Sequence, residues 1–415
     1  MSEWKAVSLE DISQIVGGGT PSKEKTEYWG GEIPWVTPTD VTRGKVRKLE
    51  FTENRITKIG LSESSAKLIP SGSILMTTRA TIGECVINMI PMATNQGFTN
   101  FICNERVYNE YLYYALCRHK IDFERLGSGS TFKEVSKRTI RSFKVMLPPL
   151  PEQRKIAAIL SSVDEVIEKT EAIIKQTETV KKGLMQQLLT RGIGHIRFKQ
   201  TEIGEIPEEW EIKTLGQVTE SSAFGPRFPA NSYNEKGNYA LLRTTDIKDN
   251  WEINYSGMPM ALLPMDKFNK HVLQKGDLLV TRSGTCGLVC IFNEYNVPVI
   301  PGAFLIRFRL SSTVVPEFVR FTMMTVNSQA RIAQMASGGV QKNLSGTNLK
   351  KLVLPIPPIT EQKRIVKIIN SILSKMRYEQ QYLTQLQTLK KGLMQVLLTG
   401  KVRVKVDERE EVVVP

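Results

Sequence analysis

Two nearly identical decapeptides divide this chain of 415 residues. KKGLMQQLLT occupies positions 181–190 and KKGLMQVLLT occupies positions 390–399, so the copies lie 209 residues apart. The same offset relates Glu152-Gln153 to Glu361-Gln362, and each of these pairs follows a proline-rich turn. A period near 209 residues is far too long for a solenoid. The sequence therefore predicts a tandem duplication, with two copies of one domain, each followed by the same helix.

The globular parts repeat as well. Thr39-Asp40 aligns with Thr245-Asp246, and LIPSGSILMTTRATIGECVI (68–87) resembles VLQKGDLLVTRSGTCGLVCI (272–291). Short β-branched runs alternate with helical patterns in both copies, which predicts the α+β class with a twisted, partly antiparallel sheet. The predicted strands are residues 73–77, 84–88, 99–103, 277–281, 288–292 and 304–309, and the predicted helices are residues 109–117 and 316–326.

A heptad seam follows each proline-rich turn, with apolar residues spaced alternately four and three apart. The seam residues are Ile156, Leu160, Val163, Ile167, Ile174, Leu184 and Leu188 in the first copy, and Ile365, Ile369, Ile372, Met376, Leu383, Leu386, Leu393 and Leu397 in the second. Each helix is expected to be about 40 residues and roughly 60 Å long. Pro151 suits a first turn, Thr360 suits an N-cap, and Gly192 and Gly400 suit the ends.

Two such seams can be buried against each other or against a partner. The spacing alone leaves a parallel and an antiparallel pair open, and the alternative is a helix packed on its own domain. Pairing would explain why KKGLMQ occurs twice, as the same packing surface at the far end of both helices.

The composition favours a polyanionic partner. The formal net charge is +14 and the pI is about 9.4, which points to nucleic acid first, although ordinary basic solubility gives the same charge. The five cysteines are scattered and odd in number, as in a reduced cytoplasmic protein. No run of 18 or more apolar residues exists, so no membrane span is predicted.

The usual catalytic patterns are missing from the sequence. The glycine run IVGGGTPS (15–22) lacks the lysine of a phosphate-binding loop. Neither Pro-Pro pair carries the polar and aromatic neighbours that an amino-methyltransferase needs, and Glu211-Ile212-Lys213 is an isolated nuclease-like triplet. The three histidines lie far apart, so neither a histidine-based triad nor a metal cluster is expected. We therefore expect no catalytic residue and no metal ligand in this chain.

Both repeats instead carry an arginine among hydroxyl residues at a hairpin tip. Arginine can donate in a bidentate manner to guanine or phosphate, and hydroxyls can contact either phosphate or base edges. For any one of these residues, an exposed charge or a structural ion pair is the alternative. The candidate DNA-contacting residues are Thr20, Arg43, Lys45, Arg47, Thr77, Thr78, Arg79, Thr81, Lys133, Arg227, Arg243, Lys248, Thr281, Arg282, Ser283 and Lys342.

Taken together, these motifs resemble the specificity subunits of type I restriction-modification systems. The resemblance covers nearly the whole chain. It rests on the doubled P-x-x-EQ-x-x-I helix starts (149–156 and 358–365), the doubled LKKGLMQ-like helix ends, GGTPS (18–22) and GEIPEEWE (204–211).

The resemblance implies a non-catalytic subunit with two target recognition domains, each reading one half of a bipartite double-stranded DNA site. Two long antiparallel coiled-coil helices with pseudo-twofold symmetry would set the spacer and dock two modification (methyltransferase) subunits. Restriction subunits can join them. S-adenosylmethionine, ATP and Mg would belong to these partners, and no cofactor to this chain. The implied segments are residues 1–148 (first recognition domain), 149–192 (central helix), 193–356 (second recognition domain), 357–401 (C-terminal helix) and 402–415 (tail).

Two other readings stay open at the level of sequence. One is a stand-alone, repressor-like DNA-binding protein, which could use the seams to dimerise. The other is a self-contained restriction-modification enzyme whose motifs are not recognisable.

Overall fold

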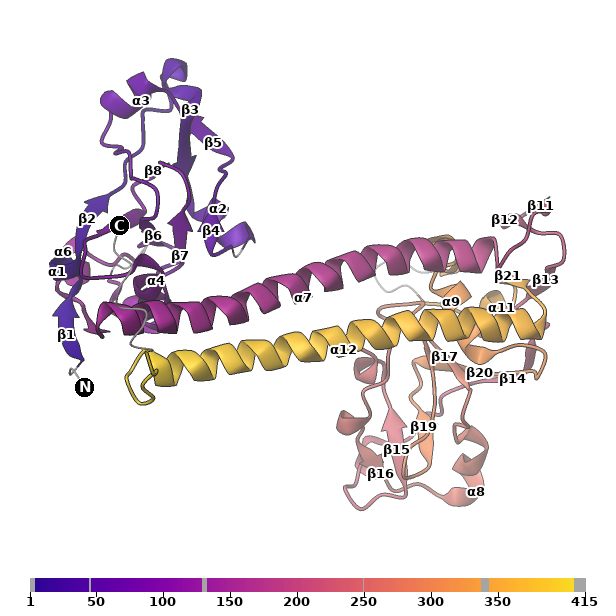
Figure 1. Cartoon of the computed structure of the whole chain (residues 1–415). Helices are drawn as coiled ribbons and strands as arrows, with labels where there is room; N and C mark the ends of the chain where they lie inside the picture. Colours follow the sequence, from indigo (N-terminus) through magenta and orange to yellow (C-terminus); the bar gives the residue numbers. More distant parts are fainter. Residues whose placement is uncertain (1–3, 45, 129–132, 249, 337–342, 407–415) are drawn as a thin grey trace. The chain divides into compact units, whose positions relative to one another are not determined.

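The computed structural model describes residues 4–44, 46–128, 133–248, 250–336 and 343–406 (Figure 1). The chain forms two compact units: unit 1 is Met1–Ala172 with Gln380–Pro415, and unit 2 is Ile173–Glu379. Each unit therefore contains one globular repeat and the parts of both long helices that pack on it. This division differs from the five segments expected from the sequence, because the two helices are shared between the units.

The globular part of unit 1 is built on a five-stranded sheet of order β2-β9-β6-β7-β4 and a three-stranded sheet of order β5-β3-β8. Its strands are β1 (Lys5–Ser8), β2 (Ser13–Gly17), β3 (Trp29–Val36), β4 (Lys48–Leu49), β5 (Asn54–Ile56), β6 (Ile74–Thr77), β7 (Cys85–Asn88), β8 (Ala93–Thr94), β9 (Phe98–Cys103) and β10 (Lys144–Leu147). Its helices are α1 (Leu9–Ile12), α2 (Pro38–Gly44), α3 (Lys58–Ser62), α4 (Asn109–Arg118), α5 (Lys120–Leu126) and α6 (Lys137–Ser142), after which α7 (Leu150–Thr190) begins.

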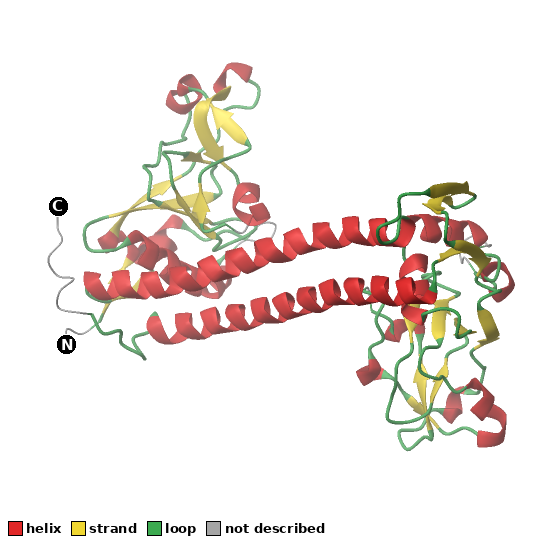
Figure 2. Cartoon of the chain, turned by 45° about the vertical axis from the view of Figure 1, so that its right-hand side comes forward, coloured by secondary structure: helices red, strands yellow, loops and turns green. Residues whose placement is uncertain are grey.

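The globular part of unit 2 repeats this topology. The antiparallel order β14-β20-β17-β18 corresponds to β2-β9-β6-β7, and β16-β15-β19, with β15 and β19 parallel, corresponds to β5-β3-β8. Its strands are β11 (Phe198–Thr201), β12 (Gly204–Pro207), β13 (Glu211–Thr214), β14 (Thr219–Phe224), β15 (Tyr239–Leu242), β16 (Met260–Ala261), β17 (Leu278–Thr281), β18 (Val289–Ile291), β19 (Val299–Pro301), β20 (Leu305–Leu310) and β21 (Val353–Ile356). Its helices are α8 (Met265–Phe268), α9 (Pro316–Met323), α10 (Val326–Met335) and α11 (Gly346–Leu349), after which α12 (Ile359–Leu397) begins. The predicted duplication and α+β class are confirmed, and strands and helices mix in both units (Figure 2).

The long helices pair antiparallel within each unit. In unit 1, Ile156 and Leu160 near the start of α7 share a buried cluster with Leu397 near the end of α12. In unit 2, Leu188 near the end of α7 packs with Ile365 near the start of α12. The spacing left the orientation open, the family resemblance implied an antiparallel pair, and these two contacts confirm that pair.

All residues of the predicted seam are buried or half-buried. In unit 2, Leu184 and Met185 of the first KKGLMQ copy pack on the core that contains Trp210. In unit 1, Leu393 and Met394 of the second copy pack on the core that contains Tyr111. Each copy thus ends its helix against the domain of the other repeat, which explains why the decapeptide occurs twice.

The helix ends follow the sequence signals with one exception. Pro151 lies in the first turn of α7, and Gly192 and Gly400 take positive φ angles of 64° and 71° just beyond the helices. Thr360 is not the N-cap, because α12 already begins at Ile359. Among the described residues, no helix is both long and apolar enough to cross a membrane.

Candidate nucleic-acid interface

The threonines of the two hairpin tips hold the backbone. The Thr77 hydroxyl donates to the carbonyl of Thr81 and accepts from Glu84 N, and Thr281 makes the equivalent bonds with Thr285 and Leu288. Thr78 is also buried, and its hydroxyl donates to Gly97 O at 3.1 Å. These three hydroxyls are internally satisfied, so they are not available to a ligand.

The two arginines do not occupy equivalent positions. Arg79 forms a β-bridge with Glu134, whereas in unit 2 the corresponding bridge joins Ser283 to Asn343. Arg79 therefore matches Ser283, and Arg282 matches Thr78. The two tips share their backbone shape, since Ala80 and Gly284 both have positive φ angles, 59° and 72°. The sequence aligned the tips correctly, but the arginines lie one residue apart.

The contacts of the two arginines also differ. Arg79 Nε lies 2.9 Å from Glu134 Oε2 in an exposed ion pair. Arg282 stacks over the Phe224 ring, with its guanidinium carbon 4.4 Å from the ring centroid, and its Nε donates to Asn343 Oδ1 at 3.2 Å. The charge of Arg79 is thus balanced locally, whereas Arg282 has only neutral partners in these contacts.

The repeated Thr-Asp elements cap the turns after β3 and β15. Asp40 accepts from Thr37 N at 2.7 Å and from Glu53 N at 3.1 Å. Asp246 accepts from Arg243 N at 2.8 Å and from the Arg243 guanidinium. The hydrogen bond to Asp246 raises the pKa of Arg243. Both aspartates therefore have a structural role, and Arg243 is engaged with one of them.

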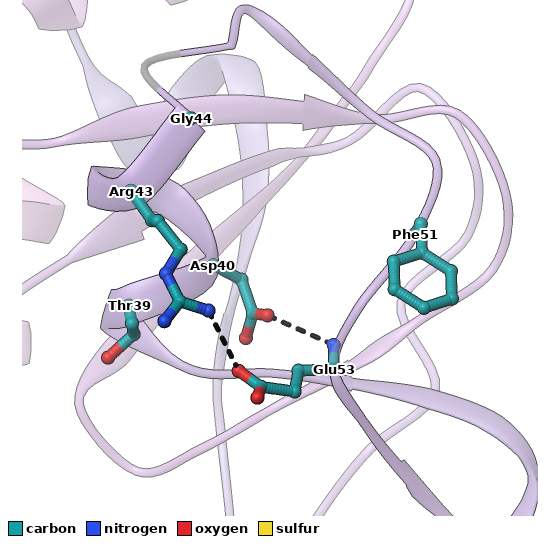
Figure 3. A pocket seen from close by; sticks show the side chains of 6 residues that line it. All are labelled: Thr39, Asp40, Arg43, Gly44, Phe51 and Glu53. Carbon is teal, nitrogen blue, oxygen red and sulfur yellow. Dashed lines mark hydrogen bonds and ion pairs between the residues drawn. The ribbon is translucent and has the colours of Figure 1, made fainter. Parts of the chain in front are cut away.

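A hollow of about 420 Å³ lies beside the first of these turns (Figure 3). It is lined by Thr39, Asp40, Arg43, Gly44, Phe51 and Glu53. Arg43 reaches from α2 to Glu53 at 3.4 Å, with three quarters of its side chain exposed. An exposed pair of this kind contributes little to stability, so Arg43 can exchange Glu53 for a phosphate at little cost.

The other candidates differ in burial and in their contacts. Arg47 lies inside unit 1 and pairs with Glu110 at 3.2 Å, so we exclude it from the interface. Thr20 donates its hydroxyl to the Gln96 side chain. The exposed candidates are Thr81, Lys133, Arg227 and Lys248, and half-buried Ser283 lies beside the second tip. Lys45 and Lys342 lie outside the described residues.

The described part of the chain contains no group of three or more His, Cys, Asp or Glu side chains that could hold a metal ion. The family model for the type I restriction modification DNA specificity domain matches residues 1–179 and 207–388. The chain belongs to this family.

Relatives of this specificity family match both repeats. The Type I restriction enzyme MjaIX specificity subunit of Methanocaldococcus jannaschii is 28% identical over 417 residues, covering 97% of this chain and 94% of the relative. The fold is similar to that of the type I restriction-modification S subunit from M. genitalium, with a TM-score of 0.58 at 14% identity over 95% of this chain and 96% of that one. A chain from a type I R-M system, solved to explain complex assembly and conformational transition, gives a TM-score of 0.58 at 18% identity over 97% and 99% of the two chains.

Two buried glutamates of this specificity chain were not recognised as a structural device from the sequence. In unit 1, Glu152 at the start of α7 accepts from Trp4 Nε1 at 2.8 Å and from the Arg403 guanidinium, which follows α12. In unit 2, Glu361 accepts from Trp210 Nε1 at 3.0 Å, and from His195 Nε2 and Ile193 N, each at 2.9 Å. Each glutamate thus ties the start of one long helix to the segment that follows the other.

The neighbouring glutamines attach the helices to the globular repeats. Gln153 accepts from Tyr108 N at 2.7 Å, and Gln362 accepts from Val315 N at 2.8 Å. These bonds explain why the Glu-Gln motif occurs twice: the glutamate contacts the segment after the other helix, and the glutamine contacts the globular repeat. The available sequence signal was the repeat of the motif itself, together with Trp4 and Trp210, which lie 206 residues apart.

Proposed function

We propose that this chain is the non-catalytic specificity subunit of a type I restriction-modification enzyme, in which each globular repeat reads one half of a bipartite DNA site. One observation carries the proposal: two repeats of the same topology present differently built, arginine-bearing tips. A duplicated reader with two different surfaces suits a target whose two halves differ. Base contacts specify sequence, while the surrounding lysines supply phosphate contacts.

We further propose that the paired helices dock two modification subunits, one for each repeat. The support is an exposed apolar row on α7, formed by Val166, Ile173 and Val180 at intervals of seven residues, which lies outside the buried seam. On α12, Tyr382 and Leu389 are exposed at the same interval. Apolar rows with this spacing fall on one face of a helix and are suited to packing against a partner.

A methylation map tests the main proposal. The chain is co-expressed with its modification subunit in a host that lacks adenine methylation, and the native DNA is then sequenced. We expect methylation at a bipartite motif with a fixed spacer, and none when this chain is omitted. A soluble complex that methylates no motif would favour the stand-alone DNA-binding protein. The mass of the purified complex measures the number of modification subunits, and a value other than two would contradict the docking proposal.

A further inference from the structure

An arginine in unit 2 is held in a defined orientation at the protein surface. The Arg282 guanidinium stacks on the ring of Phe224, a residue that is 43% exposed. Arg282 Nε donates to Asn343. The two terminal nitrogens, Nη1 and Nη2, have no hydrogen-bond partner in the described part of the chain. The stack and the single Nε bond thus fix the plane of the guanidinium and leave its donor edge open.

The corresponding place in unit 1 is built from different residues. Phe224 on β14 pairs with Ile306, in the same register in which Gly17 on β2 pairs with Thr99. Gly17 therefore takes the position of the aromatic ring. Because Gly17 has no side chain, this position in unit 1 offers no ring on which an arginine could stack.

A second exchange accompanies the first. Ser136 and Ser345 are equivalent N-caps, so Lys137 matches Gly346. In unit 1 the Lys137 amine occupies the space that a side chain on Gly17 would need. In unit 2 the Phe224 ring lies 3.5 Å from the position of a Cβ on Gly346. A small residue faces a large one in both units, with the sizes reversed, so the two surfaces are differently constructed at one site.

The charge balance differs too. Glu134 of unit 1 neutralises Arg79 at 2.9 Å, and the matching residue in unit 2 is the neutral Asn343. Asn343 holds Arg282 without cancelling its charge. Of the two tip arginines, Arg282 therefore combines a charge that no acidic partner balances among the described residues, a fixed plane, and two terminal nitrogens without a partner in those residues.

We propose that Arg282 reads a guanine in the half-site of unit 2, with Nη1 and Nη2 donating to the O6 and N7 atoms in the major groove. This rests on the proposed function. Guanine presents two adjacent acceptors there, which match the planar donor edge of arginine, and no other base presents that pair. Because the side chain is ordered before DNA binds, little conformational entropy is lost on binding.

The test uses the full chain assembled with its modification subunit, and duplex DNA in which each base of the wild-type methylation motif is varied singly. We expect the wild type to prefer guanine at one position of one half-site. R282K keeps the charge but loses the donor edge, and should reduce that preference about tenfold or more. F224L removes the stack and N343E introduces the acidic partner of unit 1, so both should reduce the same preference. K275A, at an exposed lysine of the same unit that pairs with Glu294, is the charge control and should leave the preference unchanged.

Three outcomes would overturn the assignment. One is a R282K complex that binds every sequence more weakly by the same factor, because this identifies a phosphate contact. The second is an unchanged guanine preference in R282K and N343E, each with a wild-type unfolding temperature. The third is reduced preference in both half-sites at once. A wild-type complex without any sequence preference would instead contradict the proposed function on which the assignment rests.

Discussion

Glu152 and Glu361 show how much one side chain can organise in this protein. Each is buried at the start of a long helix, and each accepts hydrogen bonds from a tryptophan indole and from the segment after the other helix. A buried carboxylate is costly unless its oxygens are satisfied by several donors. For each glutamate the donors come from two segments that lie outside its own helix, so the bonds form only when the helix start and both of these segments are in place.

Removing the second of these carboxylates should therefore destabilise unit 2. Glu361→Ala leaves Trp210 Nε1, His195 Nε2 and Ile193 N without their acceptor, and we expect a loss of about 2–4 kcal/mol in the free energy of unfolding. Urea denaturation followed by tryptophan fluorescence measures the change. Glu361→Gln keeps an acceptor and should lose less, while Glu208→Ala, at an exposed position, serves as the control. Wild-type stability in Glu361→Ala would contradict the structural role of this glutamate.

Single-residue predictions from the sequence succeeded where the cause is local. The repeated threonines and the arginines were correctly assigned to equivalent hairpin tips. The burial of Arg47 could not be predicted, because its partner Glu110 is 63 residues away. The one-residue offset between Arg79 and Arg282 already follows from the alignment of 68–87 with 272–291, and the bridges to Glu134 and Asn343 agree with it. Contact with DNA by the exposed candidates stays a prediction.

The pairing of α7 with α12 contains a polar layer in unit 1. Asp164 is buried in the seam, accepts from the Tyr114 hydroxyl at 2.7 Å and lies 2.6 Å from Lys390 Nζ. These contacts join α4, α7 and α12. The residues at the repeat positions in unit 2 are Phe321, Leu373 and Lys181, so the tyrosine hydroxyl and the carboxylate are missing there and apolar groups take their places. Such a difference favours each helix end pairing in its own unit.

Disrupting the polar layer should weaken unit 1 specifically. Asp164→Ala leaves the Lys390 amine and the Tyr114 hydroxyl in a largely buried site without their carboxylate, and we expect a loss of about 2–4 kcal/mol. The double change Asp164→Leu with Tyr114→Phe copies the layer of unit 2 and should recover part of this loss, because apolar contacts replace the missing bonds. Guanidinium unfolding followed by circular dichroism compares the variants. Equal stability of the wild type and Asp164→Ala would show that the layer contributes nothing.

The helices were the best-predicted elements, for a physical reason. A heptad seam is a local pattern, and the positions it marks, from Ile156 to Leu188 and from Ile365 to Leu397, are buried or half-buried. Orientation could not follow from that pattern, because parallel and antiparallel pairs both bury the same seam. It is fixed by contacts between residues far apart in the sequence, such as Asp164 with Lys390. The N-cap of α12 was misplaced by two residues, because α12 begins at Ile359 and not after Thr360.

For the whole molecule, duplication separates what must stay the same from what can change. The Glu-Gln anchors, the threonines Thr77 and Thr281 and the helix ends recur in equivalent structural roles in both units. The residues that differ, such as Phe224 for Gly17 and Asn343 for Glu134, lie around the tips. This division suits a protein that keeps one scaffold and changes what each repeat recognises. The repeat offset of 209 residues already matches Glu134 with Asn343, whereas the match of Gly17 with Phe224 comes from the strand register.

The continuous helices lead to the last prediction. Each begins in one unit and ends in the other, so under the proposed function their length should set the spacing between the two half-sites. Deleting 171–177 together with 377–383 removes one heptad from each helix, where the segments face each other if the Asp164–Lys390 pairing continues along the helices. The seam keeps its phase after a heptad deletion. Each helix becomes shorter by about 10 Å, which corresponds to about three base pairs of DNA.

Methylation mapping of the deletion variant should therefore give the wild-type half-sites with a spacer shortened by about three base pairs. Deleting 171–177 alone is the matched comparison, because it leaves the two helices unequal in length. The helix ends can then no longer pair as they do in the wild type, and we expect loss of methylation instead of a shorter spacer. An unchanged spacer in the double deletion would show that the length of the helices does not set the distance between the half-sites. A changed half-site sequence would mean that the helices take part in base recognition, which the tips alone are proposed to perform.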